Sequence, residues 1–152
     1  ADRVVATQML CLNLGEMDPV EGMVEVFGQQ VLGVSVNCAK CHDHKLDAYS
    51  QPDYYALAGV FTSSVIAGTK GPKAGGVDLP GEPGVKVLAL VDGTPADTAL
   101  LVRGERGQKG PVVPRRFPVA LAGDNRTPLG QLTTQSGRLE LARWATDPAH
   151  PL

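Results

Sequence analysis

Residues 38–45 read CAKCHDHK. Within this stretch, Cys38, Cys41 and His42 form a C-x-x-C-H motif. The motif is typical of c-type haem attachment, in which the two thiols bond to the haem vinyl groups and the next histidine ligates the iron. Nowhere else in the sequence do sulfur and nitrogen ligands gather so closely. The interpretation of the chain therefore begins at this motif.

Two other uses of a C-x-x-C pair remain open. A redox dithiol of the thioredoxin type lies where a helix opens after a strand, whereas here the pattern predicts a helix that closes at the motif. A structural zinc or iron site needs about four ligands, usually from separated pairs. Its candidates are Cys38, Cys41, His42 and His44, with Cys11, Asp47 or His150 to complete the set.

The sequence does not identify a sixth ligand for a haem iron. Each of the methionines before the motif lies on an apolar stretch, where core packing is the simpler role. These residues are Met9, Met17 and Met23. His44 is too close to His42 to reach across a porphyrin, so we expect it to make hydrogen bonds in a loop. Loop and cap roles are also expected for the flanking Asp43, Asp47 and Asp53.

Local patterns predict a helix before the motif. Asp18 and Pro19 are a strong helix start, and apolar residues then recur at three- and four-residue steps. This helix is expected to run to about Val36. Gly28 and Gly33 would let a neighbour approach closely, and either a packed helix or a flat porphyrin would use that space.

The remaining elements give an α+β fold class. We expect helices at residues 2–14, from Pro52 to Phe61, and from a Ser136 cap to Pro148. Glycines and prolines make 67–84 a loop, while 85–103 is predicted to be a β-hairpin that turns at 92–95, followed by an extended stretch to Pro118. The division is therefore a helical segment with the motif (1–66), a Gly/Pro-rich loop (67–84), a hairpin region (85–135) and the start of a following helical domain (136–152).

Composition excludes several function classes. The formal net charge is only −2 and no basic stripe is present, which argues against nucleic acid as the partner. No apolar run reaches the ~18 residues that cross a bilayer. The sequence shows neither a nucleophile–base–acid set nor a nucleotide-binding fingerprint, so no self-contained catalytic set is visible and enzyme status stays open. An anion site at Arg103, Arg106, Arg115 and Arg116 is less expected than scattered surface arginines.

Longer stretches carry a resemblance. Residues 32–47, LGVSVNCAKCHDHKLD, continuing into DYYALAGVF at 53–61, resemble the second cytochrome-like domain of the planctomycete surface-cytochrome family. DRVVAT at 2–7 and VDGTPADT at 91–98 are also similar to it, and SGRLELARW at 136–144 resembles the start of the surface domain that usually follows. The sequence departs from the family at Leu46, where Phe is usual, and at 48–49, where Pro-Ile is usual.

The resemblance implies a piece of a larger exported bacterial protein, in the periplasm or at the cell surface, with covalent haem c at Cys38, Cys41 and His42. It implies no reaction, because the family itself has no assigned function. The family pattern continues through His44 and Asp47, which makes these two residues candidate ligands of a different metal site.

The leading hypothesis is electron transfer through a c-type haem, with a redox protein and the rest of the larger chain as partners. The alternative is a non-haem zinc or iron site, or a structural segment of a surface protein. An enzyme whose catalytic residues lie mostly elsewhere in the larger chain is a weaker third hypothesis.

Overall fold

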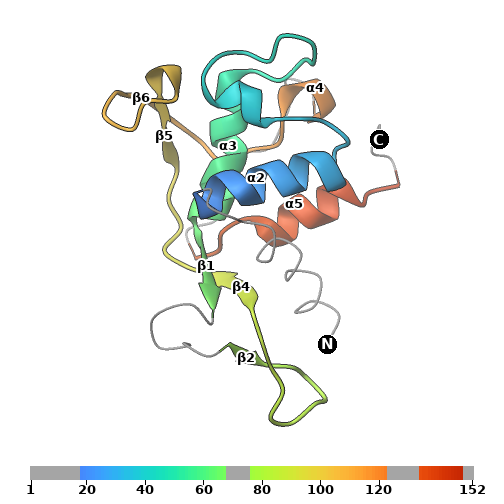
Figure 1. Cartoon of the computed structure of the whole chain (residues 1–152). Helices are drawn as coiled ribbons and strands as arrows, with labels where there is room; N and C mark the ends of the chain where they lie inside the picture. The colour runs from blue at the N-terminus through green and yellow to red at the C-terminus, as the bar shows by residue number, and fades with distance from the viewer. Residues whose placement is uncertain (1–17, 68–75, 123–133, 149–152) are drawn as a thin grey trace.

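The computed structural model describes residues 18–67, 76–122 and 134–148. Its helices are α2 (Pro19–Gln30), the 3₁₀ turn η1 (Asn37–Lys40), α3 (Gln51–Thr62), the 3₁₀ turn η2 (Val102–Gly104), α4 (Val119–Ala122) and α5 (Arg138–Ala145). Its strands are β1 (Ser64–Ala67), β2 (Val77–Asp78), β3 (Lys86–Val87), β4 (Ala89–Asp92), β5 (Thr98–Leu101) and β6 (Lys109–Val113). The fold is therefore α+β, as predicted (Figure 1). The helix expected at 2–14 lies outside the described residues.

Helix α2 begins where the sequence predicts. The Asp18 carboxylate accepts a hydrogen bond from the Val20 N–H at 3.0 Å, and Pro19 occupies the first turn, where its missing N–H costs nothing. The helix ends at Gln30, however, and the prediction that it runs to Val36 is wrong. Gly33 has a φ of +67°, which reverses the chain and brings Val36 back onto the helix. A Cβ on Gly28 would lie 2.7 Å from Val36 Cγ2, so the chain itself fills the space beside Gly28.

Helix α3 is fixed by a capping box. The Ser50 side chain accepts from the Asp53 N–H, and the Asp53 carboxylate accepts from the Ser50 N–H at 3.1 Å. Pro52 again lies in the first turn, which confirms the predicted start. The helix is buried almost all round, from Asp53 to Phe61. A helix that is buried on all sides lies inside the fold rather than on its surface.

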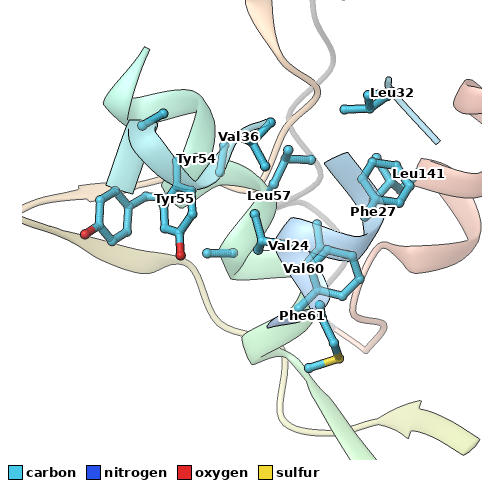
Figure 2. Close-up of a cluster of buried hydrophobic side chains, with 14 of the residues drawn as sticks. Val24, Phe27, Leu32, Val36, Tyr54, Tyr55, Leu57, Val60, Phe61 and Leu141 are labelled. Carbon is cyan, nitrogen blue, oxygen red and sulfur yellow. The ribbon is translucent and has the colours of Figure 1, made fainter. Parts of the chain in front are cut away.

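The core lies between α2 and α3. Phe27 of α2 and Phe61 of α3 meet with ring centroids 6.0 Å apart, and Val24 and Leu57 are fully buried in the same cluster (Figure 2). Leu141 of α5 joins this cluster with 2% of its surface exposed. The C-terminal helix therefore packs into the same core as the helices that flank the motif.

The strands pair differently from the prediction. Instead of an 85–103 hairpin, β4 pairs antiparallel with β1, and β5 pairs antiparallel with β6 (Figure 1). The stretch between β4 and β5 is an open connection, because Ser63 Oγ accepts from the Ala96 N–H at 3.0 Å and Asp97 accepts from the Arg115 N–H at 3.0 Å. These contacts hold 96–97 against distant residues and prevent a tight turn.

Two smaller expectations also change. The described part of the 67–84 loop contains β2, which pairs with β3. Gly137 rather than Ser136 is the N-cap of α5, and the Ser136 hydroxyl donates to Asp92 at 2.5 Å. Among the described residues, no helix is long and apolar enough to cross a membrane.

Candidate functional site

The C-x-x-C-H motif lies on its own short turn rather than at the end of α2. Cys38 is inside η1, and Cys41 is its C-cap, with its N–H bonded to the Cys38 carbonyl at 3.4 Å. Residues three apart lie on the same side of a 3₁₀ helix, so both side chains share one face. Both thiols are free and exposed, whereas Ala39 between them is fully buried. The turn is thus held by the buried Ala39, and both cysteines are exposed to solvent.

Helix α2 holds this turn at both ends. The Asn37 side-chain amide donates to Glu25 at 2.8 Å, and the Lys40 amine pairs with Glu21 at 2.5 Å. Both carboxylates belong to α2, one turn apart. The spacing of the thiols is therefore supported by the same helix that forms the core.

A main-chain contact fixes the tautomer of His42. Its ring is exposed, and Nδ1 lies 2.7 Å from the carbonyl oxygen of Asp43. A carbonyl oxygen only accepts hydrogen bonds, so Nδ1 carries the ring proton and donates it. The lone pair then lies on Nε2, and a main-chain carbonyl that fixes the tautomer in this way is typical of histidine ligands.

His44 has the opposite arrangement. Its Nδ1 accepts hydrogen bonds from the N–H groups of Asp47 at 2.8 Å and Leu46 at 3.3 Å. The neutral ring then carries its proton on Nε2, so neither nitrogen has a free lone pair in this conformation. The Asp47 carboxylate lies 3.4 Å from the same Nδ1. Through these contacts the His44 ring holds the main chain of the 44–49 loop in place.

The flanking aspartates have cap and loop roles, as expected. Asp43 Oδ1 accepts from the Gln51 N–H at 2.8 Å, at the first turn of α3. Asp53 caps the same helix and also accepts from the Val119 N–H at 3.1 Å. The contact to His42 comes from the carbonyl of Asp43 rather than from its carboxylate.

Helix α3 and the β5–β6 hairpin supply contacts that the motif does not reveal. The Gln51 side-chain amide donates to the Lys40 carbonyl at 2.8 Å and to the Leu101 carbonyl at 2.9 Å. Tyr55 Oη also donates to the Lys40 carbonyl, at 3.0 Å. A Cβ on Gly104 would lie 2.5 Å from Cys41 Sγ. No sequence pattern marks Gln51 or Tyr55 as part of the site. Gly104 also has a left-handed φ of +75°, which favours glycine.

A cavity of about 670 Å³ opens beside the motif, between α2, α3 and the hairpin. Tyr54, Tyr55 and Ala58 form part of its lining, and the Glu21–Lys40 pair lies at its edge. Burial raises the pKa of the Tyr54 hydroxyl, with a further contribution from Glu21. Burial is also the main cause of the raised pKa of Tyr55. Both hydroxyls therefore stay protonated at neutral pH, and that of Tyr55 donates to the Lys40 carbonyl.

Two of the four arginines considered as an anion site, Arg106 and Arg115, are engaged elsewhere. Arg115 is buried, its Nε lies 3.1 Å from Asp97, and it donates to the carbonyls of Gln135 and Ser136. Arg106 pairs with Asp18 at 2.8 Å. Arg115 is thus a structural cation rather than a scattered surface residue.

The side chains near the motif can be compared with what a metal ion and a haem each require. Within residues 18–67, 76–122 and 134–148, no three His, Cys, Asp or Glu side chains come together to hold a metal ion. Cys11 and His150 lie outside these ranges. Haem attachment needs no such convergence, because the thiols bond to the porphyrin and only the histidine ligates the iron. The exposed thiols and the free Nε2 of His42 therefore fit a covalent haem.

Residues 8–65 match the family model described as "PSCyt2: Protein of unknown function (DUF1549)". This segment, a little over a third of the chain, is therefore similar to the PSCyt2 family. The match agrees with the resemblance to planctomycete cytochrome-like domains noted in the sequence. No curated protein and no solved structure matches the chain.

The PSCyt2 segment contains α2, the motif and α3, and it ends within β1. The β5–β6 hairpin, which contacts Cys41 through Gly104, lies after the matched residues. The site therefore combines PSCyt2 residues with a part of the chain that the family model does not cover. The division of the chain into four segments stays a prediction.

Proposed function

We propose that Cys38 and Cys41 attach a haem c covalently, that His42 is its proximal ligand, and that the segment transfers electrons within an exported bacterial protein. The observation that carries this proposal is the ring of His42, whose Nδ1 donates to the Asp43 carbonyl and whose Nε2 has no partner within residues 18–67, 76–122 and 134–148. Exposed thiols on one face of η1 supply the second requirement. When bound, the haem supplies reversible one-electron transfer at its iron.

The chain's own chemistry is addition of two thiols. Each S–H adds across a vinyl C=C bond: sulfur bonds to the carbon next to the ring, and the proton ends on the terminal carbon. No electrons are transferred in this addition and no group leaves. The thiols must be reduced when they react.

The position of the motif supports haem over a thioredoxin-like dithiol. A helix that opens at a C-x-x-C pair stabilises a thiolate through its dipole. Here Cys38 lies inside η1, a turn of only four residues that ends at the motif. A zinc or iron site at the same residues would need ligands beyond those that the described residues bring together.

The proposal includes location and partners. Haem c is attached outside the cytoplasm, so we expect the protein in the periplasm or at the cell surface. A redox protein and the rest of the larger chain would exchange electrons with it.

The test is expression as an exported protein in cells that carry the haem-attachment machinery. After extraction with acid and acetone, a Soret band should remain with the wild-type chain and be lost from a Cys38→Ser, Cys41→Ser double variant. A colourless wild-type protein with stoichiometric zinc or non-haem iron would favour the alternative.

The two histidines provide a matched comparison in the same experiment. His42→Ala should keep covalent haem but change the spectrum of the iron, because the proximal ligand is lost. His44→Asn should leave that spectrum unchanged, since the Asn carbonyl can accept the same main-chain N–H groups. The reverse pattern would assign the ligand to His44 instead.

A further inference from the structure

The end of the β5–β6 hairpin lies against Cys41. Arg103 and Gly104 in η2 have positive φ values of 55° and 75°, so the main chain takes a left-handed bend there. At this bend a Cβ on Gly104 would lie 2.5 Å from Cys41 Sγ and 3.7 Å from Cys41 Cβ. Only a glycine leaves room for the sulfur in its present position.

One side chain joins the hairpin to the motif. The Gln51 side-chain amide donates hydrogen bonds to the carbonyls of Lys40 and Leu101, at 2.8 and 2.9 Å. Lys40 directly precedes Cys41, and Leu101 directly precedes η2. The relative position of Cys41 and the bend at Gly104 is therefore set by Gln51, with Tyr55 bonded to the same Lys40 carbonyl.

We propose that the β5–β6 hairpin is one wall of the attachment site and that Gly104 and Gln51 are positioning residues for Cys41. The wall closes one side of Cys41 Sγ, so a planar electrophile such as a porphyrin vinyl group reaches this sulfur from the side away from Gly104. The identity of that electrophile rests on the proposed function. The wall itself rests on contacts within the chain.

The first test uses the reduced chain without haem. Maleimide alkylation followed by mass spectrometry gives the rates at Cys38 and Cys41 separately. Gln51→Met keeps length and helix preference but removes both N–H donors, so the ratio of the Cys41 rate to the Cys38 rate should rise about fivefold. Gln108→Met is the control, because Gln108 lies in the same hairpin and its amide bonds only to the exposed Glu105 side chain. An unchanged ratio in Gln51→Met would overturn the proposal.

The second test uses the haem-loaded chain. Gly104→Ala places a methyl group where Cys41 Sγ lies, so attachment should proceed at Cys38 alone and leave Cys41 free for alkylation. The alkaline pyridine spectrum should then shift to longer wavelength, because one vinyl group stays conjugated with the ring.

Two glycines control for the substitution itself. Gly107 lies in the same hairpin, and Gly84 has a positive φ of 83°; a Cβ on either would meet nothing within 4 Å. Both alanine variants should form two thioethers. If Gly104→Ala carried a doubly attached haem at wild-type yield, the proposal that the hairpin is a wall of the attachment site would be wrong. Absence of covalent haem in the wild type would contradict the proposed function, and the alkylation ratio would still decide the inference.

Discussion

At the residue scale, His42 and His44 differ in the hydrogen bonds that their Nδ1 atoms make. Nδ1 of His42 donates to a carbonyl, whereas Nδ1 of His44 accepts from main-chain N–H groups. The motif in the sequence identifies both histidines as candidates but does not determine their tautomers. Those depend on how the 42–49 loop folds back, which a pattern of residue types does not encode.

Tyr49 gives a prediction at the same scale. It is 6% exposed, and its buried hydroxyl has no hydrogen-bond partner among the residues that the structure describes. Tyr49→Phe removes an unsatisfied polar group and should raise the free energy of unfolding by about 1 kcal/mol. Tyr55→Phe is the matched control and should lower it by about 1 kcal/mol, because the bond to the Lys40 carbonyl is lost. Urea unfolding measures both free-energy changes. If Tyr49→Phe were as destabilised as Tyr55→Phe, the account of the Tyr49 hydroxyl as buried and unpaired would be wrong.

The same residue predicts a pH dependence. Burial, followed by the charges of Asp47 and Asp53, raises the pKa of Tyr49 from 10.0 to about 12. The folded state then holds the phenol proton more tightly than the unfolded state. This contribution to stability is complete below about pH 10 and is lost as the pH rises towards about 12.

Unfolding at about pH 8 and about pH 11 therefore provides the measurement. The wild type should lose more stability over this interval than Tyr49→Phe does. Tyr54 and Tyr55 also have raised pKa values, so the variant should reduce the loss rather than remove it. Equal losses in the two proteins would contradict the raised pKa of Tyr49.

At the element scale, helix starts were predictable and strand partners were not. Asp18-Pro19 and Ser50-Gln51-Pro52 specify their helices locally, through a cap and a proline in the first turn. The end of α2 depends on Gly28 and Val36 packing together, and the partner of β5 depends on how distant residues hold 96–97. The hydrogen bonds at 96–97 join residues 33 and 18 positions apart, and local periodicity carries no information about them or about the packing of Gly28 on Val36.

Asp53 tests how much α3 contributes to the fold. Its carboxylate accepts from Ser50 within the capping box and from the N–H of Val119, the first residue of α4, and it is 1% exposed. Asp53→Ala should therefore lower the free energy of unfolding by about 3 kcal/mol, since buried donors lose their acceptor.

Asp18→Ala is the matched control for this substitution. Asp18 also caps a helix, but its other partner is the exposed Arg106, so the cost should be about 1 kcal/mol. Thermal or urea unfolding compares the two variants. Equal costs would mean that the bond to Val119 contributes nothing to stability.

At the scale of the whole molecule, the motif, the core and the hairpin form one arrangement. Helix α2 holds η1 through Glu21 and Glu25, α3 holds it through Gln51, and the hairpin lies against Cys41. The sequence predicted the fold class and the similarity of residues 8–65 to the PSCyt2 family. The wall formed by the hairpin was not predictable, because it depends on a strand pairing that the local pattern assigned differently.

Covalent attachment through both cysteines is the central claim, and a tryptic digest tests it most directly. Trypsin cleaves after Lys40, between Cys38 and Cys41, and releases the peptides Val4–Lys40 and Cys41–Lys45. In protein made with the haem-attachment machinery and then reduced, these peptides should stay joined and carry the mass of one haem. Two separate peptides, with Cys38 alkylated as well as Cys11 in the first and Cys41 alkylated in the second, would contradict the account.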